Sequence, residues 1–310
     1  MFETTLMGLQ FEHPVFNAPG EVKRLEHVKA LCSSAAVAIM VGSITWEQRD
    51  GNAGNVYYPG PEFSLNSLGL PNGGREYYRK HLPDMVRMAH DAGKPLFVSV
   101  AGFSPHEYLR LADLVAEAGA DAVELNLGCP NVWDGGQQKG ILSFEPDRID
   151  ETLGLLKFEL DLPVSLKLSP YSDPGMIPRI AEVLKRHADM VKAISAVNCF
   201  PNALKFGDDG QPVITPGQGL AGLGGPAMRP IALGQVFQWF KVLPTRYIQI
   251  IRVGGASHGK DVFESESLGA TATQVGTAFF NEGPGIFSRI LAEMVELQSK
   301  APNYGTVELG

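Results

Sequence analysis

The segment Glu124-Leu-Asn-Leu-Gly-Cys-Pro-Asn131 carries two amides and a thiol where a buried strand is expected to end. Carboxamides offer paired hydrogen-bond donors and acceptors, and a cysteine acts as a base once its surroundings favour the thiolate. Asn126, Cys129 and Asn131 could therefore hold a planar heterocycle and exchange a proton with it. The alternative is that Cys129 is a small buried apolar residue, the commoner state of a cysteine. A Cys-His hydrolase is also conceivable, but no histidine lies in the loops expected near Cys129.

A lysine, Lys167, interrupts the apolar stretch Ser165-Leu-Lys-Leu-Ser-Pro170. A cation inside a barrel strand is costly without an anionic partner, so a ligand that becomes negatively charged, such as a reduced flavin, would account for it. The weaker alternative is a lysine on an edge strand with its ammonium group in water, because a closed barrel has no edge.

Glycines end the last two expected strands, in Ile251-Arg-Val-Gly-Gly-Ala256 and Val275-Gly-Thr-Ala278. A glycine lets backbone N–H groups approach an anion closely, and a following helix terminus adds a favourable field. Gly254, Gly255, Gly276 and Thr277 therefore form a candidate phosphate site. Each motif alone could serve only a tight turn, and two such motifs in adjacent units are more specific.

Eight short apolar stretches rich in β-branched residues are expected to be the strands that position these groups. They are Pro14–Gly20, Val37–Thr45, Pro95–Gly102, Asp121–Pro130, Leu162–Pro170, Met190–Cys199, Tyr247–Gly255 and Ala272–Ala278.

Helical spacing separates these strands and follows the last one. The expected helices are Lys23–Ser33, Arg75–Ala92, Pro105–Ala118, Pro146–Leu160, Gly175–Ala188, Pro226–Val242, Gly259–Leu268 and Pro284–Gln298. Eight alternating units indicate an α/β fold, a closed (β/α)8 TIM barrel, although a doubly wound open sheet would show the same alternation. We expect one domain over residues 1–310, with a short N-terminal extension and two long strand-end loops, 45–75 and 198–226, at the face where barrel sites are built.

The composition of the chain argues against several classes of binding partner. The formal net charge of −8 argues against binding to nucleic acid or to an anionic membrane. The three cysteines, Cys32, Cys129 and Cys199, lack the spacing of a disulfide framework or a metal site, which favours a reducing cytoplasm and no metal. No signal peptide or stretch of ~20 apolar residues is found, so neither secretion nor membrane insertion is expected.

Taken together, the motifs identify a resemblance: the chain resembles the dihydroorotate dehydrogenases along nearly its full length. The matching pieces are Asn17-Ala-Pro-Gly20, Gly42-Ser-Ile-Thr45, Asn66-Ser-Leu-Gly-Leu-Pro-Asn72, Asn126-Leu-Gly-Cys-Pro-Asn131, Lys167, Asn198, Gly222-Leu-Gly-Gly225, Gly254-Gly255 and Gly276-Thr277. The loop 66–72 and Cys129 are similar to the cytosolic class 1 enzymes, because class 2 enzymes use serine as the base.

The resemblance implies FMN as cofactor and oxidation of dihydroorotate to orotate, a step of pyrimidine biosynthesis. The cofactor phosphate would lie at Gly225, Gly254, Gly255, Gly276 and Thr277. Lys167 would face the flavin ring, and the remaining cofactor contacts would come from Ala18, Gly42, Ser43, Asn126 and Asn198.

By the same resemblance, the pyrimidine would stack on the flavin. Cys129 would take the proton from C5 as hydride leaves C6. The residues expected to bind the substrate are Lys23, Asn66, Leu68, Gly69, Leu70, Asn126, Asn131, Asn198 and Cys199.

Two positions depart from the class 1 pattern. Class 1 enzymes usually carry a lysine in a Thr-Lys-Ser-Ser run, where this chain has Gly42. Class 2 enzymes take their lysine from the loop after the first barrel strand, where this chain has Lys23, so Lys23 is expected to bind the substrate carboxylate and to assist catalysis. A solvated lysine in a first helical turn is the alternative. Cys199 stands where class 1 usually has a serine, which weakens one expected hydrogen bond.

Three functions are compatible with these observations. The leading one is dihydroorotate oxidation, with a soluble electron acceptor such as fumarate and, as in class 1 relatives, a homodimer. A second is FMN-dependent oxidation of another dihydropyrimidine or an enone. A third is a non-redox, phosphate-binding lyase or isomerase with Lys167 as an amine nucleophile.

Overall fold

The computed structural model describes residues 2–134, 137–157 and 160–300. Eight parallel strands form one sheet in the order β3-β16-β15-β12-β11-β8-β7-β4, so the first and last strands of this sheet in chain order, β3 and β16, are neighbours. All eight expected strands are confirmed, each a little shorter than expected. Their bounds are β3 (Val15–Asn17), β4 (Ile39–Ile44), β7 (Leu96–Val100), β8 (Ala122–Asn126), β11 (Val164–Leu168), β12 (Val191–Ala196), β15 (Gln249–Val253) and β16 (Ala272–Val275).

A side chain helps to close the barrel between β3 and β4. The carboxamide of Asn17 donates to the Met40 carbonyl at 2.7 Å and accepts from the Met40 N–H at 2.9 Å. One amide therefore replaces the donor and acceptor that a neighbouring strand would supply. A closed (β/α)8 barrel is the result, as expected.

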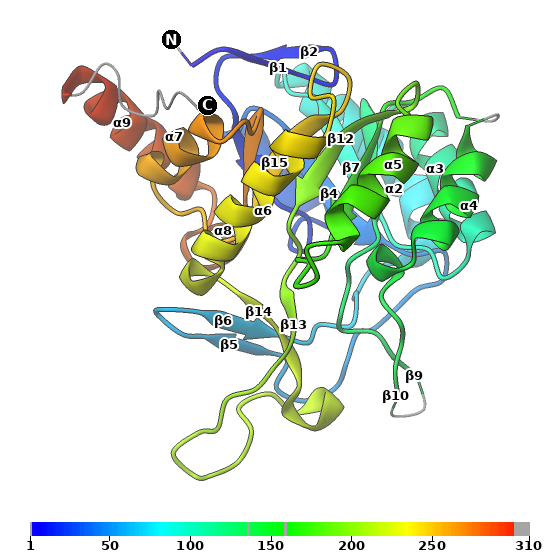
Figure 1. Ribbon diagram of the computed structural model, residues 1–310, viewed down its shortest axis with the longest axis vertical. Helices are drawn as coiled ribbons and strands as arrows, with labels where there is room; N and C mark the ends of the chain where they lie inside the picture. The colour runs from blue at the N-terminus through cyan, green and yellow to red at the C-terminus, as the bar shows by residue number, and fades with distance from the viewer. Residues whose placement is uncertain (1, 135–136, 158–159, 301–310) are drawn as a thin grey trace.

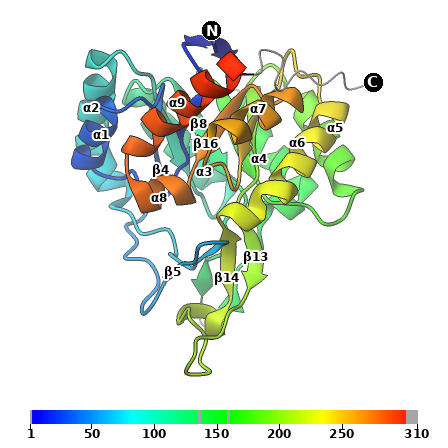
Figure 2. The ribbon, with the colours of Figure 1, turned by 90° about the vertical axis from the view of Figure 1, so that its left-hand side faces the viewer.

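Helices surround this barrel, as Figures 1 and 2 show from two sides. They are α1 (Leu25–Cys32), α2 (Gly74–Asp91), α3 (Pro105–Glu117), α4 (Pro146–Leu156), α5 (Met176–Arg186), α6 (Arg229–Val242), α7 (Gly259–Ser267) and α9 (Gly285–Lys300). Local signals set some ends: the hydroxyl of Ser104 accepts from the Glu107 N–H and Pro105 opens α3. Short 3-10 turns cover Leu142–Phe144, Pro216–Gly219 and Pro226–Met228.

Several expected boundaries were wrong, three of them at or next to a helix end. The helix expected over Pro146–Leu160 ends at Leu156, and residues 158–159 lie outside the described chain. The first turn of the helix expected from Pro226 is a 3-10 turn. The last strand ends at Val275 rather than Ala278, because a short helix, α8 (Thr277–Glu282), begins directly after Gly276.

Apolar side chains fill both sides of the barrel wall. Inside, Phe16 and Phe97 meet edge to face at 5.8 Å. An N-terminal hairpin of β1 (Thr4–Leu6) and β2 (Leu9–Phe11) adds Leu6 and Phe11 to the same cluster. Outside, a larger cluster joins the strands to the helices. Burial of each such large side chain is worth roughly 1.5–3 kcal/mol, so the wall holds the strand ends firmly.

The two long segments expected as strand-end loops, 45–75 and 198–226, carry short strands that the sequence analysis did not predict. They contain β5 (Tyr57–Pro59), β6 (Ser64–Asn66), β13 (Phe200–Ala203) and β14 (Ala221–Gly224), which form one antiparallel sheet in the order β13-β14-β6-β5. β6 pairs with β14 across 156 residues of sequence, a pairing that no local turn signal announces. In Figure 1 this sheet lies below the barrel.

A third loop, after β8, carries a small hairpin of β9 (Trp133–Asp134) and β10 (Gln137–Gln138). Gly217 lies against the ring of Trp133, where an added Cβ would come within 2.2 Å of the indole. The hairpin is therefore packed against the loop between β13 and β14.

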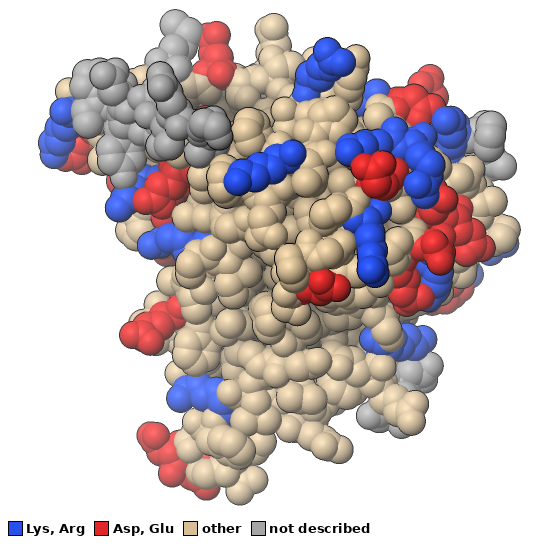
Figure 3. Space-filling view, in the orientation of Figure 1, with Lys and Arg blue, Asp and Glu red and all other residues tan. Residues whose placement is uncertain are grey.

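Charged side chains are unevenly distributed over the face in Figure 3. They gather over the helices beside the barrel, whereas the region of the antiparallel sheet presents mostly uncharged groups. Within the described ranges, no helix combines the length and the apolar character needed to span a bilayer. The assignment of residues 1–310 to one domain stays a prediction.

Candidate active site

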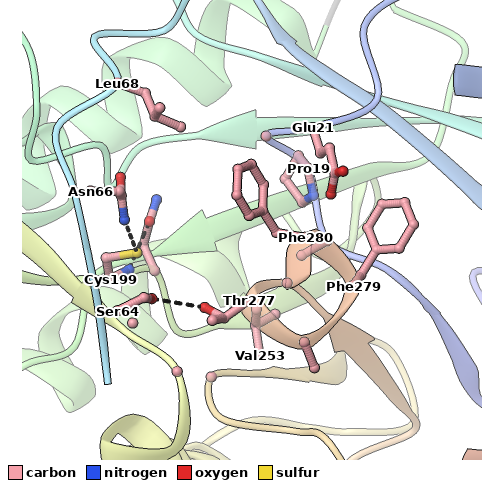
Figure 4. A pocket seen from close by; sticks show the side chains of 18 of the residues that line it. Pro19, Glu21, Ser64, Asn66, Leu68, Cys199, Val253, Thr277, Phe279 and Phe280 are labelled. Atoms are coloured by element: carbon pink, nitrogen blue, oxygen red, sulfur yellow. Dashed lines mark hydrogen bonds between the residues drawn. The ribbon is translucent and has the colours of Figure 1, made fainter. Parts of the chain in front are cut away.

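A cavity of about 420 Å³ lies at the carboxyl ends of the barrel strands, between the barrel and the antiparallel sheet. Figure 4 shows side chains from both parts turned into it. Residues predicted from sequence to form the site line this cavity together: Ala18, Lys23, Ser43, Asn66, Leu68, Gly69, Leu70, Asn126, Cys129, Asn131, Lys167, Asn198, Cys199, Gly225, Gly254, Gly255, Gly276 and Thr277.

Gly42 is the predicted cofactor residue that does not line the cavity. Its φ is +117°, and a Cβ there would lie 2.3 Å from the carbonyl oxygen of Ser99, so this backbone excludes any longer side chain. Its N–H donates to Val22 at 2.8 Å and its carbonyl accepts from Gly20 at 2.7 Å. Gly42 thus supports the neighbouring loop through its backbone, and its place among the cofactor contacts stays a prediction.

That loop, between β3 and α1, presents Lys23 to the cavity. The ammonium group donates to the carbonyl of Pro71 at 2.6 Å. Burial lowers the pKa of Lys23 to about 8, while the nearby Cys129 raises it. A partly desolvated cation of this kind favours an anionic ligand, because an anion would supply the charge partner that water no longer does.

Cys129 enters the cavity from the loop after β8 and remains partly accessible. Burial raises the pKa of its thiol to about 11, and the Cys199 thiol adds to the rise. A hydrogen bond from the Asn131 backbone and the charges of Arg49 and Lys23 act in the opposite direction. The group therefore has the exposure and the cationic neighbours of a proton acceptor, but it is mostly a neutral thiol in the protein without ligand.

Two chains of hydrogen bonds fix the amides. On one side Asn131 donates to the Asn66 carboxamide oxygen at 2.8 Å, and Asn66 donates to the Cys199 sulfur at 3.2 Å.

On the other side Asn198 donates to the Asn126 oxygen at 3.0 Å, and Asn126 donates to the Ser43 hydroxyl at 2.8 Å. Each amide has its orientation set by a neighbour, so the cavity presents a fixed pattern of donors and acceptors.

Lys167 forms part of the cavity floor. It is only 4% exposed, and its ammonium group lies 3.5 Å from the side-chain oxygen of Gln274. This long contact leaves donor capacity for a ligand above it.

Glycines form the opposite end of the cavity. The backbone N–H groups of Gly255 and Gly276 donate to no protein acceptor in the described part of the chain. A Cβ at Gly255, whose φ is +73°, would lie 2.7 Å from the Arg229 nitrogen and 3.0 Å from the Gly225 carbonyl. Free N–H donors on a surface without side chains fit a phosphate group, and the amide-lined remainder of the cavity fits a planar ring system.

Several lining residues were missed from sequence. The hydroxyl of Ser64 lies 3.1 Å from that of Thr277, and Tyr57 packs on Phe280 with ring centroids 4.4 Å apart. Ser64 and Tyr57 belong to the unexpected antiparallel sheet, so no local signal placed them here.

Four charged or titratable side chains that line the cavity were also missed: Glu21, His258, Glu282 and Arg289. One carboxylate oxygen of Glu21 is buried without a hydrogen-bond partner among the described residues, and burial raises the pKa of Glu21. Its place in the strand-end segment Gly20–Lys23 was the one signal that could have indicated it.

Known proteins of similar sequence indicate the family to which this chain belongs. A profile described as dihydroorotate dehydrogenase matches residues 1–297. The dihydroorotate dehydrogenase (fumarate) of Trypanosoma cruzi is 35% identical and covers 98% of this chain and 95% of that protein. Dihydroorotate dehydrogenase A (fumarate) of Lactococcus lactis subsp. lactis is 34% identical, covering 97% and 95%.

The fold also has a solved counterpart. A crystal structure of DHODH from Eimeria tenella, in complex with ferulenol, superimposes with a TM-score of 0.83 over 98% of this chain and 86% of that one. At 19% identity this likeness concerns the barrel architecture.

Proposed function

This chain belongs to the dihydroorotate dehydrogenase family and oxidises dihydroorotate to orotate, and we propose that it does so with FMN as cofactor and Cys129 as base. The observation that carries the proposal is one cavity that joins a thiol and fixed amides to a glycine surface with free N–H donors. The first end fits a pyrimidine and the second a phosphate.

The glycine end would hold the FMN phosphate through Gly225, Gly254, Gly255, Gly276 and Thr277. Lys167 would face the flavin ring from the floor, with Ala18, Ser43, Asn126 and Asn198 around it. When bound, FMN supplies an acceptor for the hydride that leaves C6 of dihydroorotate.

Chemistry at the substrate falls to Cys129 and Lys23. The Cys129 sulfur would remove the proton from C5, while the Lys23 ammonium would bind the carboxylate and lower the free energy of the nearby thiolate. Asn66, Asn131 and Asn198 would hold the ring amides. Lys23 takes the part that a lysine at position 42 has in class 1 relatives, since Gly42 has no room for one.

We propose fumarate as the electron acceptor, because the relatives from T. cruzi and L. lactis carry it in their names. The homodimer and the cytoplasmic location stay predictions. Anaerobic oxidation of the dihydroorotate-reduced protein by fumarate would test the acceptor.

The test of the whole proposal is an anaerobic visible spectrum of the purified protein mixed with dihydroorotate. Bleaching of a bound flavin is the expected result. A yellow protein that does not bleach would move the substrate to another dihydropyrimidine or an enone. A colourless protein that binds a sugar phosphate would favour the non-redox barrel enzyme with Lys167 as nucleophile.

A further inference from the structure

A layer of polar groups lies inside the barrel, one level below the cavity floor. Glu124 on β8 is fully buried. One of its carboxylate oxygens accepts from the Ser195 hydroxyl at 2.6 Å and from the Gln274 amide at 3.4 Å. Its other oxygen is buried without a partner among the described residues. A carboxyl group left half satisfied in an apolar barrel destabilises the fold, so packing alone does not account for it.

Gln274 links this carboxyl group to the cavity. Its amide nitrogen faces Glu124, and its oxygen faces the ammonium group of Lys167 at 3.5 Å. The described residues show no direct ion pair between Lys167 and Glu124. A glutamine can turn either end toward a neighbour, and an acceptor at Glu124 makes this orientation the favourable one. Glu124 therefore fixes which end of the amide meets Lys167.

We propose that Glu124 is a positioning residue that sets the electric field beneath the flavin. Through Gln274 it orients the contact to Lys167, and its negative charge offsets the ammonium charge at the floor. The inference rests on the proposed function, because it concerns the cofactor that Lys167 faces.

The direction of the effect follows from charge. Oxidation of dihydroorotate sends a hydride to the flavin and a proton to Cys129, so the ring system above Lys167 gains one negative charge. A carboxylate below Lys167 opposes that gain, and the lysine favours it. Glu124 should therefore lower the midpoint potential of the bound flavin, and Lys167 should raise it.

Two variants separate charge from shape. Glu124→Gln keeps the shape and removes the charge, whereas Glu124→Asp keeps the charge and shortens the side chain. We expect Glu124→Gln to favour flavin reduction by about tenfold in the equilibrium constant, which is about 30 mV for a two-electron couple. Glu124→Asp should stay near the wild-type potential. Equal potentials in wild type and Glu124→Gln, or equal shifts in both variants, would overturn the inference and leave Glu124 with a packing role.

A second pair covers the case in which Glu124→Gln alone does not fold because it leaves Lys167 as an uncompensated buried cation. Lys167→Met should lower the potential, and Glu124→Gln combined with Lys167→Met should return it toward wild type, because the net buried charge is again zero. A double variant with the same potential as Lys167→Met would contradict the inference.

The midpoint potential of the bound flavin can be measured without dihydroorotate. Potentials come from dye-equilibrated reduction of the FMN-loaded protein, checked by the ratio of apoprotein affinities for oxidised and reduced FMN. A wild-type protein that binds no FMN would overturn the proposed function and this inference with it. A bound flavin whose potential ignores the charge at position 124 would overturn the inference alone.

Discussion

The two ends of the cavity are built in different ways. At the phosphate end the contacts are backbone N–H groups on short loops that directly follow barrel strands, as at Gly255 and Gly276. At the substrate end they are side chains such as Lys23, Asn66 and Cys129, which come from three different loops. Backbone recognition depends on the absence of side chains, whereas the other end depends on which side chains are present.

This difference predicts which property a substitution at each end of the cavity will impair. A substitution at the glycine end should act through steric exclusion and affect anything with a phosphate. A substitution at the substrate end should act through charge or proton transfer and leave the flavin in place. The following changes test that division, in order of decreasing effect.

The largest effect is expected for Cys129→Ser. A serine hydroxyl is a far weaker base, so flavin reduction by dihydroorotate should slow by about 10²–10⁴-fold, as for loss of a general base. The flavin absorbance should be unchanged. Stopped-flow reduction measures the rate, with Cys32→Ser as control, because the Cys32 thiol lies on α1 and donates to the Met88 carbonyl.

The pH dependence sharpens this test. Since burial raises the pKa of the Cys129 thiol to about 11, the thiolate fraction grows tenfold per pH unit below that value. In wild type the reduction rate should rise with pH between about 6 and 9. A rate that stays flat across that range, or a Cys129→Ser variant at full speed, would remove this thiol from the mechanism.

At the other end, Gly255→Val should weaken FMN binding by about a hundredfold, because its Cβ meets backbone atoms at 2.7 and 3.0 Å and overpacking costs roughly 1–3 kcal/mol. Fluorescence titration of apoprotein gives the affinity. The affinity for riboflavin, which lacks the phosphate, should fall much less. Gly234→Ala is the control, since a Cβ there meets nothing within 4 Å. Equal losses for FMN and riboflavin would place the phosphate elsewhere.

Lys23→Met should weaken orotate binding by about ten- to a hundredfold, the range for one charge-assisted hydrogen bond of roughly 1.5–3 kcal/mol. FMN should stay bound. As a control, Lys29→Met at an exposed position on α1 should change neither orotate binding nor FMN binding. Because burial lowers the pKa of Lys23 to about 8, its positive charge is present below that pH and lost above it. Orotate titrations in wild type should therefore weaken as pH passes 8, and Lys23→Arg should abolish that decline.

The smallest change is expected for Cys199→Ser. Asn66 donates to the Cys199 sulfur at 3.2 Å, and a hydroxyl is a better acceptor on a shorter side chain. The two differences oppose each other, so orotate affinity should change by about twofold at most. Isothermal titration measures it; a loss beyond tenfold would mean that the sulfur itself contacts the substrate.

Much of the fold could be predicted because strand and helix signals are local. The eight apolar stretches and the glycines after the last two strands are readable from neighbouring residues alone, and the cavity joins those glycines to Cys129 and Lys23. The antiparallel sheet was missed because Asn66 meets Gly222 only after the barrel has brought two distant loops together.

Chain-specific site features were harder to predict. The positive φ of Gly42 and its close approach to Ser99 are properties of the folded backbone that its sequence motif does not reveal. Tyr57 and Ser64 carried no motif at all. Lys23 was predicted only through the class 2 pattern, and its contact with Pro71 shows the loop that brings it to the cavity.

The hydrogen bonds between Asn17 and Met40, which help to close the barrel between β3 and β4, have a consequence for the order in which the protein is made. β3 is the first barrel strand to leave the ribosome, yet its parallel partner on one side is β16, the last. Until β16 is synthesised, β3 is held by the amide of Asn17 on Met40 and by the backbone hydrogen bond from the Val37 N–H to the Val15 carbonyl. The loop that follows β3 carries Lys23, so a nascent chain that lacks β16 should be unable to hold orotate even when Cys129 and its asparagines have already been made.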